Sequence, residues 1–180
     1  MQLENGQSAP NFVVNDIWGN TVDLARIEDK KILLCFFRYA ECAVCQLRIA
    51  EIMREKENFK KQNIEVIAVF QSPVESLKKS IVDKTHFDFT LIADEDRSLY
   101  KLYKVNASWI KTFKTLSIKG IRRIIASNNA GFRPGGKIEG LMNQIPADFI
   151  IGLDKRILVA KYGNNVIDHI PLEDILENIN

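Results

Sequence analysis

The sequence predicts one α/β domain that spans residues 1–180, in which helices cover both faces of a central β-sheet. Two observations carry this prediction. Continuous apolar runs of strand length recur along the chain, and segments of helical composition separate them. A length of 180 residues is sufficient for one core, and 46% apolar with 27% charged residues is ordinary for a soluble globular protein.

The N-terminal part of the chain alternates between expected strands and helices. A hairpin is expected first, over residues 12–17 and 18–22, with Gly19 and Asn20 at its turn. Apolar runs then predict buried strands over residues 32–37, 65–70 and 89–93. Helices are expected over residues 42–62, from Ser72 as the cap and Pro73 at the first helical position to about Asp83, and over residues 96–103.

The C-terminal part predicts two further strands and a closing helix. The strands, residues 147–153 and 157–162, form an antiparallel pair joined by the short turn 154–156, and the helix follows over residues 171–179. Residues 107–144 do not follow the alternation of strands and helices. They are therefore expected to be an insertion before the last β-hairpin.

The expected insertion is strongly basic and has helical periodicity. Between Ser108 and Gly140 it has seven basic residues and one acidic residue, a net charge of +6 in a chain whose total is +2. A glycine-rich loop, residues 131–136, ends the pattern. The simplest interpretation is a helix that packs its apolar stripe on the domain and leaves its basic face in solvent. The alternatives are a partner-docking surface, a homodimer contact, and binding to an acidic membrane surface. The apolar residues at roughly helical spacing are Trp109, Ile110, Phe113, Leu116, Ile121, Ile124 and Ile125.

Two of the three cysteines stand in the motif Cys42-Ala43-Val44-Cys45, between an expected strand and an expected helix. This placement indicates redox chemistry before metal binding. Zinc usually needs four ligands, and the two histidines, His86 and His169, belong to no second paired motif. Cys35 lies within the apolar strand and is interpreted as an inert buried thiol. No metal and no cofactor are therefore expected.

A working redox site must lower the pKa of one cysteine, because the thiolate is the attacking species. The N-terminus of a helix favours an anion, and Cys42 and Cys45 are expected there. Arg38 before the motif and Arg48 one turn after it could add positive charge, although each is first interpreted as an ordinary surface or salt-bridge residue. Glu41 would oppose the thiolate if its carboxylate pointed inward, and it is expected to face solvent.

The start of the chain and its charge give an expectation about location. Residues 1–6 lack a cationic segment followed by an apolar core, so no secretory signal is expected. No apolar run reaches the length of a membrane span. A cytoplasmic protein is therefore expected, and a total charge of +2 argues neither for nor against a nucleic acid partner.

Four segments of the chain resemble a known family. They are Ser8-Ala9-Pro10-Asn11-Phe12 with Asp16 and Gly19, then Phe70-Gln71-Ser72-Pro73-Val74-Glu75, Leu91-Ile92-Ala93-Asp94-Glu95-Asp96 and Phe149-Ile150-Ile151-Gly152-Leu153-Asp154. Their order and spacing resemble the thioredoxin-fold superfamily, in its peroxiredoxin-like branch of the AhpC/TSA type. The resemblance covers nearly the whole chain. It implies a thioredoxin-like fold: a central mixed β-sheet flanked by helices, with an N-terminal β-hairpin and a helical insertion before the last β-hairpin.

The resemblance leaves two assignments of the attacking cysteine. Peroxiredoxins carry Pro-x-x-x-Thr-x-x-Cys, a pattern that falls here on Arg38, Cys42 and Cys45. In that register Cys45 is the peroxidatic residue, and the proline and threonine are absent. Thioredoxins carry Phe-x-x-x-x-Cys-x-x-Cys, which fits Phe37 and makes Cys42 the nucleophile and Cys45 the resolving thiol. The buried acid of thioredoxin's active-site strand falls on Phe36, so that proton relay is absent.

A proline far along the chain favours the thioredoxin register. Peroxiredoxins place an active-site arginine just before the penultimate strand, and thioredoxins place a cis-proline there. This chain has Pro146, so the resemblance predicts a cis Ile145–Pro146 bond and a substrate groove shaped by both residues. Local sequence alone favours an ordinary trans proline at a strand start.

The leading prediction is a thiol-disulfide oxidoreductase, a peroxiredoxin-like antioxidant protein that uses a Cys42–Cys45 dithiol-disulfide cycle. Its expected substrate is a protein disulfide or a peroxide, and an external thiol such as thioredoxin or glutathione is expected to reduce it again. Nucleic acid is not an expected partner. Two alternatives stay open. One is a thiol peroxidase with Cys45 as the peroxidatic residue, and the other is a non-catalytic binding protein that the cysteine pair switches.

Overall fold

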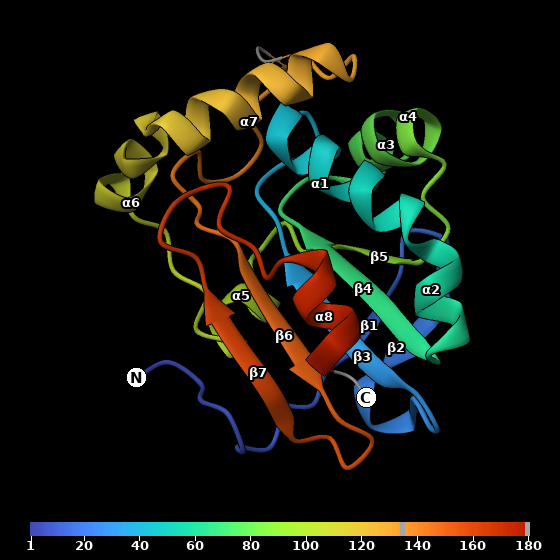
Figure 1. Ribbon diagram of the computed structural model, residues 1–180. Helices are drawn as coiled ribbons and strands as arrows, with labels where there is room; N and C mark the ends of the chain where they lie inside the picture. Colours follow the sequence, from blue (N-terminus) through green and yellow to red (C-terminus); the bar gives the residue numbers. More distant parts are fainter. Residues whose placement is uncertain (134–135, 179–180) are drawn as a thin grey trace.

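A computed structural model describes residues 1–133 and 136–178 of the chain. Its centre is a mixed five-stranded sheet with the order β5-β4-β3-β6-β7, and a separate two-stranded sheet pairs β1 with β2 (Figure 1). β3 runs parallel to β4 and antiparallel to β6. This architecture confirms the α/β class and the mixed sheet. The strands are β1 Val13–Asn15, β2 Thr21–Asp23, β3 Lys31–Phe36, β4 Ile64–Phe70, β5 Thr90–Ala93, β6 Ala147–Ile151 and β7 Ile157–Tyr162.

Helices lie on both faces of the large sheet (Figure 1). One face packs against α1, α2, α3, η2 and α8. The other face packs against α5 and the β1–β2 hairpin. Within the described residues no helix is long and apolar enough to cross a membrane. The helical elements are η1 Leu24–Arg26, α1 Ala43–Arg54, α2 Lys56–Lys61, α3 Val74–Leu77, the π-helical η2 Lys78–Val82, α4 Asp83–Thr85, α5 Ser98–Leu102, α6 Trp109–Phe113, η3 Lys114–Leu116, α7 Ile118–Asn129 and α8 Leu172–Asn178.

β3 is buried on both faces, which is why its sequence is continuously apolar. Leu33 and Cys35 point into the core under α1, whereas Leu34 and Phe36 point into the core under α5. Burying each large apolar side chain contributes roughly 1.5–3 kcal/mol. The strand is therefore held firmly, and it positions the loop that follows it.

Tyr100 of α5 fixes the end of β3. Its ring lies edge-on to that of Phe36, with centroids 5.1 Å apart. Its hydroxyl donates to the carbonyl of Phe37 at 2.7 Å, and the carbonyl oxygen of Val69 lies 3.1 Å from the same hydroxyl. The backbone N–H of Phe37 also donates to the carbonyl of Val69. The chain thus leaves the sheet from a point that a ring contact and several hydrogen bonds hold in place.

The prediction of a single helix over residues 42–62 is wrong. The structure has two helices, α1 and α2, separated at Glu55, whose φ of −91° and ψ of 6° lie outside the helical region. No glycine or proline marks this break. It redirects α2 so that Phe59 is fully buried against the sheet, and tertiary packing therefore outweighs the local helical preference.

The start of the next helix also differs from the prediction. Pro73 is the cap residue rather than the first helical residue, and Ser72 does not cap the helix. The Ser72 hydroxyl instead accepts a hydrogen bond from the Ala40 backbone N–H at 2.8 Å. Helical structure then continues past Asp83 to Thr85, through a π turn.

The insertion, residues 107–144, is helical as expected. It contains α6, η3 and α7, and an isolated bridge between Ala107 and Gln144 closes its base. α7 lies across the N-terminal end of α1 (Figure 1). Pro134 and Gly135 of the expected glycine-rich loop lie outside the described residues, as does Ile179 of the expected last helix.

Candidate active site

The two cysteines of the motif lie at the junction between β3 and α1. Cys42 is the cap residue of α1, and its carbonyl accepts the backbone N–H groups of Cys45 and Gln46, each at 2.9 Å. Cys45, three residues later, therefore lies about one turn along the helix, on the same side as Cys42. The Cys45 thiol donates to the Sγ atom of Cys42 across 2.8 Å, and both sulfurs are buried. Two thiols in this arrangement can form a disulfide with little movement of the backbone.

The two thiols have opposite acidities. Burial raises the pKa of Cys42, but the hydrogen bond from Cys45 and the positive charge of Arg38 outweigh burial and lower its pKa to about 7. The pKa of Cys45 is well above its ordinary value because of burial, its hydrogen bond to Cys42 and the neighbouring negative charge. At neutral pH Cys42 is therefore about half ionised, whereas Cys45 stays a thiol.

Arg38 is held next to the thiolate. Its Nη1 atom lies 3.6 Å from the Sγ atom of Cys42, and its Nη2 atom donates to the carbonyl of Met142. The guanidinium carbon lies 5.1 Å from the ring centre of Tyr39, and the side chain is only 8% exposed. The structure therefore places Arg38 with the two cysteines.

The other charged residues near the motif have hydrogen-bond partners of their own. Arg48 is buried, and its guanidinium donates to the carbonyl of Ile170, on the side of the core below the cysteines. The carboxylate of Glu41 accepts the backbone N–H of Lys137 at 3.0 Å, so it is bound to the insertion rather than free in solvent.

Gln71, at the end of β4, joins the cysteine loop to the insertion. Its backbone N–H and its side-chain amide both donate to the carbonyl of Arg38. The same side chain exchanges two hydrogen bonds with the backbone of Leu141, at 2.9 and 3.2 Å. Gly140 has a φ of +75°, and a Cβ atom there would lie 2.6 Å from the Gln71 amide oxygen. Sequence reasoning missed Gln71, since a glutamine after a strand has no distinctive spacing.

A cavity of about 160 Å³ opens beside Cys42, and α7 forms one of its walls. Cys42 is only 4% exposed, so this cavity is its approach to solvent. Within the described residues no cluster of three or more Cys, His, Asp and Glu side chains could hold a metal ion. The cavity is lined by Arg38, Tyr39, Glu41, Cys42, Ala43, Val44, Thr115, Ile124, Ser127 and Val166.

The sequence from the first hairpin to the last matches one family model. The AhpC/TSA family model covers residues 5–159, which include both cysteines and all seven strands except the end of β7. The chain belongs to the AhpC/TSA family. The resemblance found in the sequence is thus confirmed.

Relatives in and around the AhpC/TSA family are distant. The chain is 27% identical over 143 residues to the chloroplastic peroxiredoxin Q of Populus jackii, a match that covers 77% of the chain and 66% of that protein. It is 26% identical over 100 residues to the thiol-disulfide oxidoreductase ResA of Halalkalibacterium halodurans, covering 56% of each. The match thus spans less than two thirds of either relative's length.

Solved structures confirm the thioredoxin-like fold. The crystal structure of peroxidoxin BcpB from Mycobacterium tuberculosis superposes with a TM-score of 0.71 at 15% identity, covering 99% of this chain and 97% of that one. At this identity the similarity establishes the fold alone.

The predicted cis bond at Ile145–Pro146 is wrong, because the bond is trans in this AhpC/TSA chain. A trans bond is intrinsically favoured by about 0.5–1 kcal/mol before proline. The carbonyl of Ile145 accepts the Gln144 side-chain amide at 2.9 Å, and that of Pro146 accepts the Gly163 N–H at 2.9 Å. Both bonds hold the segment extended at the strand entrance. Ile145 and Pro146 line a second cavity of about 200 Å³ next to Tyr162, not the cavity beside Cys42.

A buried acid lies below the cysteines, on a strand that the sequence predicted but whose acid was not singled out. Asp148 of β6 is fully buried opposite Cys35, and its carboxylate lies 2.9 Å from Nδ1 of His169 and accepts the Ile170 N–H at 2.7 Å. Burial raises the pKa of Asp148, but His169 and then Arg48 outweigh it and lower the pKa. An acid within the apolar run 147–151 is the signal that could have revealed this cluster.

Proposed function

We propose that the chain is a thiol-disulfide oxidoreductase in which Cys42 attacks and Cys45 resolves. The observation that carries this proposal is the geometry of the pair: the Cys45 thiol donates to the Sγ atom of Cys42 at 2.8 Å, and Nη1 of Arg38 lies 3.6 Å from the same sulfur. Both contacts lower the pKa of Cys42, to about 7, while that of Cys45 is raised. A nucleophile should be ionised at working pH, and a resolving thiol should stay protonated until it is needed. Membership of the AhpC/TSA family and the similarity to ResA support the same chemistry.

The reaction needs only the two cysteines and an external thiol. The Cys42 thiolate attacks one sulfur of a substrate disulfide; a mixed disulfide forms, and the other substrate sulfur leaves as a thiolate that takes up a proton. Cys45 then loses its proton and attacks the Sγ atom of Cys42, which forms the Cys42–Cys45 disulfide and releases the second substrate thiol. A dithiol such as thioredoxin, or two molecules of glutathione, then reduces the site, which fits a reducing compartment such as the cytoplasm.

Peroxide is a second candidate substrate, favoured by the burial of Cys42. A sulfur that is 4% exposed beside a cavity of about 160 Å³ is open to a small oxidant without movement of α7. The Cys42 thiolate would attack the terminal peroxide oxygen, breaking the O–O bond and releasing an alcohol or water. Cys45 would then attack the resulting sulfenic acid, with water as the leaving group. The peroxiredoxin register, with Cys45 as the peroxidatic residue, is the alternative.

Three cysteine variants test the proposal. Cys42→Ser should abolish turnover of a low-molecular-weight disulfide and of hydrogen peroxide, whereas Cys45→Ser should stop at a mixed disulfide or a sulfenic acid on Cys42, detected by mass spectrometry. Cys35→Ser is the matched control and should keep turnover. A sulfenic acid on Cys45 in the Cys42→Ser variant would support the peroxiredoxin register instead. Unreactive cysteines with ordinary thiol pKa values would indicate a non-catalytic, redox-switched protein.

A further inference from the structure

Helix α7 exposes its large apolar residues, which an ordinary surface helix buries. Its buried positions are the small residues Gly120 and Ser127, and Arg123 between them is half-buried. Its isoleucines point outward: Ile118 is 73% exposed and Ile125 is 54% exposed. The expectation that the insertion packs its apolar stripe on the domain is therefore wrong. Helix α7 contacts α1 and is held to it by the Arg123–Glu51 ion pair, and Gly120 lies so close to Thr115 of η3 that a Cβ atom there would lie 1.7 Å from the Thr115 carbonyl oxygen.

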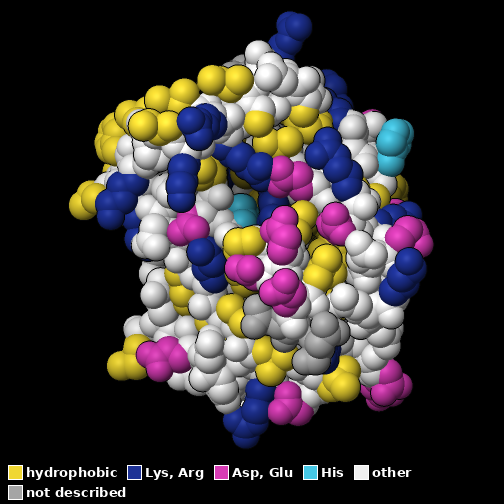
Figure 2. Space-filling model, viewed as in Figure 1, with side chains coloured by type: hydrophobic (Ala, Val, Ile, Leu, Met, Phe, Trp, Pro, Cys, Tyr) yellow, Lys and Arg dark blue, Asp and Glu magenta, His cyan; other side chains and the backbone are white. Residues whose placement is uncertain are grey.

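Together, α6, η3 and α7 form an apolar ridge along one edge of the molecule (Figure 2). Half of the sixteen exposed large apolar residues in the described part of the chain lie on this ridge. Patches of this kind on a soluble protein mark a contact with a partner or a membrane. The ridge consists of Trp109, Ile110, Phe113, Leu116, Ile118, Ile121, Ile124 and Ile125.

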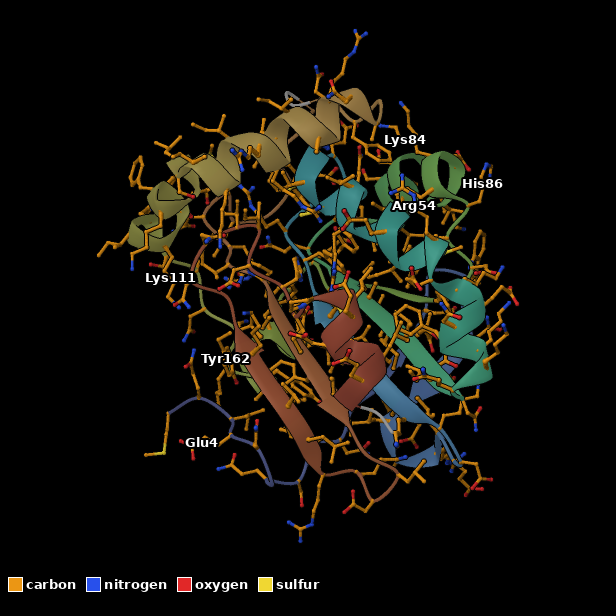
Figure 3. All side chains as sticks on the ribbon, viewed as in Figure 1. Glu4, Arg54, Lys84, His86, Lys111 and Tyr162 are labelled. Atoms are coloured by element: carbon orange, nitrogen blue, oxygen red, sulfur yellow. The ribbon has the colours of Figure 1, made fainter. Side chains whose placement is uncertain are left out.

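Positive charge surrounds the apolar ridge. Lys114, Lys119 and Arg122 are exposed along the same helices, and no acidic residue occurs between Ser108 and Ile138. Figure 2 shows dark-blue side chains directly beside the yellow ridge. Lys111, labelled in Figure 3, fixes the start of the ridge to the core by donating to the carbonyl of Gly163 at 2.9 Å.

We propose that the apolar ridge binds the surface of an anionic lipid bilayer. Isoleucine, tryptophan and phenylalanine side chains on a helix, flanked by lysine and arginine, are the composition of helices that lie in the membrane interface. The apolar side chains enter the headgroup region, and the cations remain at the level of the lipid phosphates. Trp109 and Phe113 stand together at one end, with ring centres 6.4 Å apart, where an aromatic pair anchors the helix at the interface.

Charge argues against a second copy of the chain as the partner that covers the apolar ridge. A symmetric contact would place two ridges, each within a segment of net charge +6, against one another. Like charges at that distance oppose association, whereas an anionic lipid surface attracts both the ridge and its flanks. Since Ile124 also lines the cavity beside Cys42, a bilayer bound here lies next to the dithiol.

Flotation with lipid vesicles tests the apolar part of the proposal. The protein should float with phosphatidylcholine vesicles that contain phosphatidylglycerol, and it should not float with phosphatidylcholine alone. In the Trp18→Phe variant, Trp109 is the remaining tryptophan, and its emission should shift to the blue on binding. The Ile118→Ser/Ile125→Ser variant should lose binding. The matched control, Leu153→Ser/Leu158→Ser, replaces two exposed leucines far from the ridge and should bind like the parent.

Charge variants test the electrostatic part. Each basic residue near an anionic surface contributes roughly a fivefold gain in partitioning, so Lys119→Glu/Arg122→Glu should bind at least about 25-fold more weakly. The matched control, Lys60→Glu/Lys61→Glu on α2, makes the same charge change away from the ridge and should lose far less. Binding of the parent should also weaken as salt is added.

Four outcomes would overturn the proposal. The first is absence of vesicle binding, and the second is equal binding by ridge and control variants. The third is a dimer in analytical ultracentrifugation that the isoleucine variant alone abolishes, which would assign the ridge to self-association. In the fourth, the protein binds polyglutamate as tightly as it binds vesicles, and the Ile118→Ser/Ile125→Ser variant binds polyglutamate equally well. That result would assign the ridge to an acidic protein partner. None of these measurements requires redox turnover, so they are independent of the proposed function.

Discussion

The Cys45 thiol donates a hydrogen bond to the Sγ atom of Cys42 across 2.8 Å, and this contact separates the acidities of two chemically identical side chains. It lowers the pKa of the acceptor and raises that of the donor. Helix geometry makes the contact, because the cap residue of α1 and the third residue after it face the same side.

Alkylation should therefore distinguish the two thiols by pH. The rate at Cys42 should rise with pH through a midpoint of about 7, because only the thiolate reacts. The Cys45→Ala variant removes the hydrogen-bond donor and should move that midpoint upward. Peptide mass spectrometry after timed exposure to iodoacetamide measures each cysteine separately. A midpoint near the ordinary thiol value of 9.0 at Cys42, or reaction of Cys45 first, would contradict the assignment.

The charge of Arg38 should contribute measurably to the Cys42 thiolate. An opposite charge within about 4–6 Å shifts a pKa by about 1–3 units, so Arg38→Met should raise the pKa of Cys42 by about one unit or more. At a pH below both midpoints, alkylation should then be at least about tenfold slower. The matched control is Arg54→Met, at the exposed C-terminal end of α1 (Figure 3), which should leave the rate unchanged. An Arg38→Met profile identical to the parent's would show that the hydrogen bond from Cys45 acts alone.

The strands and the redox motif could be predicted because their signals are local. A strand buried on both faces must be continuously apolar, as β3 is, and the spacing of Cys42 and Cys45 alone places both thiols on one side of a helix. The pairing of Asp148 with His169 joins residues 21 positions apart and has no spacing rule, so it became visible only in the structure.

The errors at Glu55 and α7 have a common physical origin, because there tertiary contacts overrule a local preference. Burial of Phe59 breaks the expected helix. At Pro146 the local preference for a trans bond was correct, and the expectation carried over from the resemblance was wrong. In α7 the small residues that allow close packing, rather than the isoleucines, face the domain. Periodicity located the apolar stripe correctly but does not state which side of a helix the protein covers.

Loosening α7 should expose Cys42 to large reagents. The Arg123–Glu51 ion pair links α7 to α1, and residues of α7 line one side of the cavity at Cys42. A half-exposed pair contributes about 0–1 kcal/mol, so Arg123→Ala should speed the reaction of Cys42 with a polymer-linked maleimide by up to about fivefold. The rate with iodoacetamide should change little, since that reagent already fits the cavity. The control Lys30→Ala breaks an ion pair with Glu65 at the far end of the sheet. Equal acceleration of both reagents would indicate a change in thiol acidity rather than in access.

The buried pair of Asp148 and His169 should be a major contribution to stability. Hydrogen bonds to a buried charged group contribute about 1.5–3 kcal/mol, so Asp148→Asn, which weakens the contact with His169, should lower the free energy of unfolding by roughly that amount. The control Asp154→Asn breaks an exposed pair with Arg156 and should cost about 0–1 kcal/mol. Urea denaturation of the reduced protein measures both.

The pH dependence of the same measurement gives the sign of the effect. The pKa of Asp148 in the folded protein is lower than its ordinary value of 3.8. Its ionised form therefore stabilises the folded state above that value, and the stabilisation is lost as pH falls through the folded pKa. The parent should lose stability on acidification more steeply than Asp148→Asn, which has no proton to take up at this position. If the two proteins respond to acid in parallel, while Asp148→Asn still lowers stability at neutral pH, the contribution of Asp148 is its hydrogen bond with His169 and not its charge, since the asparagine oxygen can still accept the Ile170 N–H.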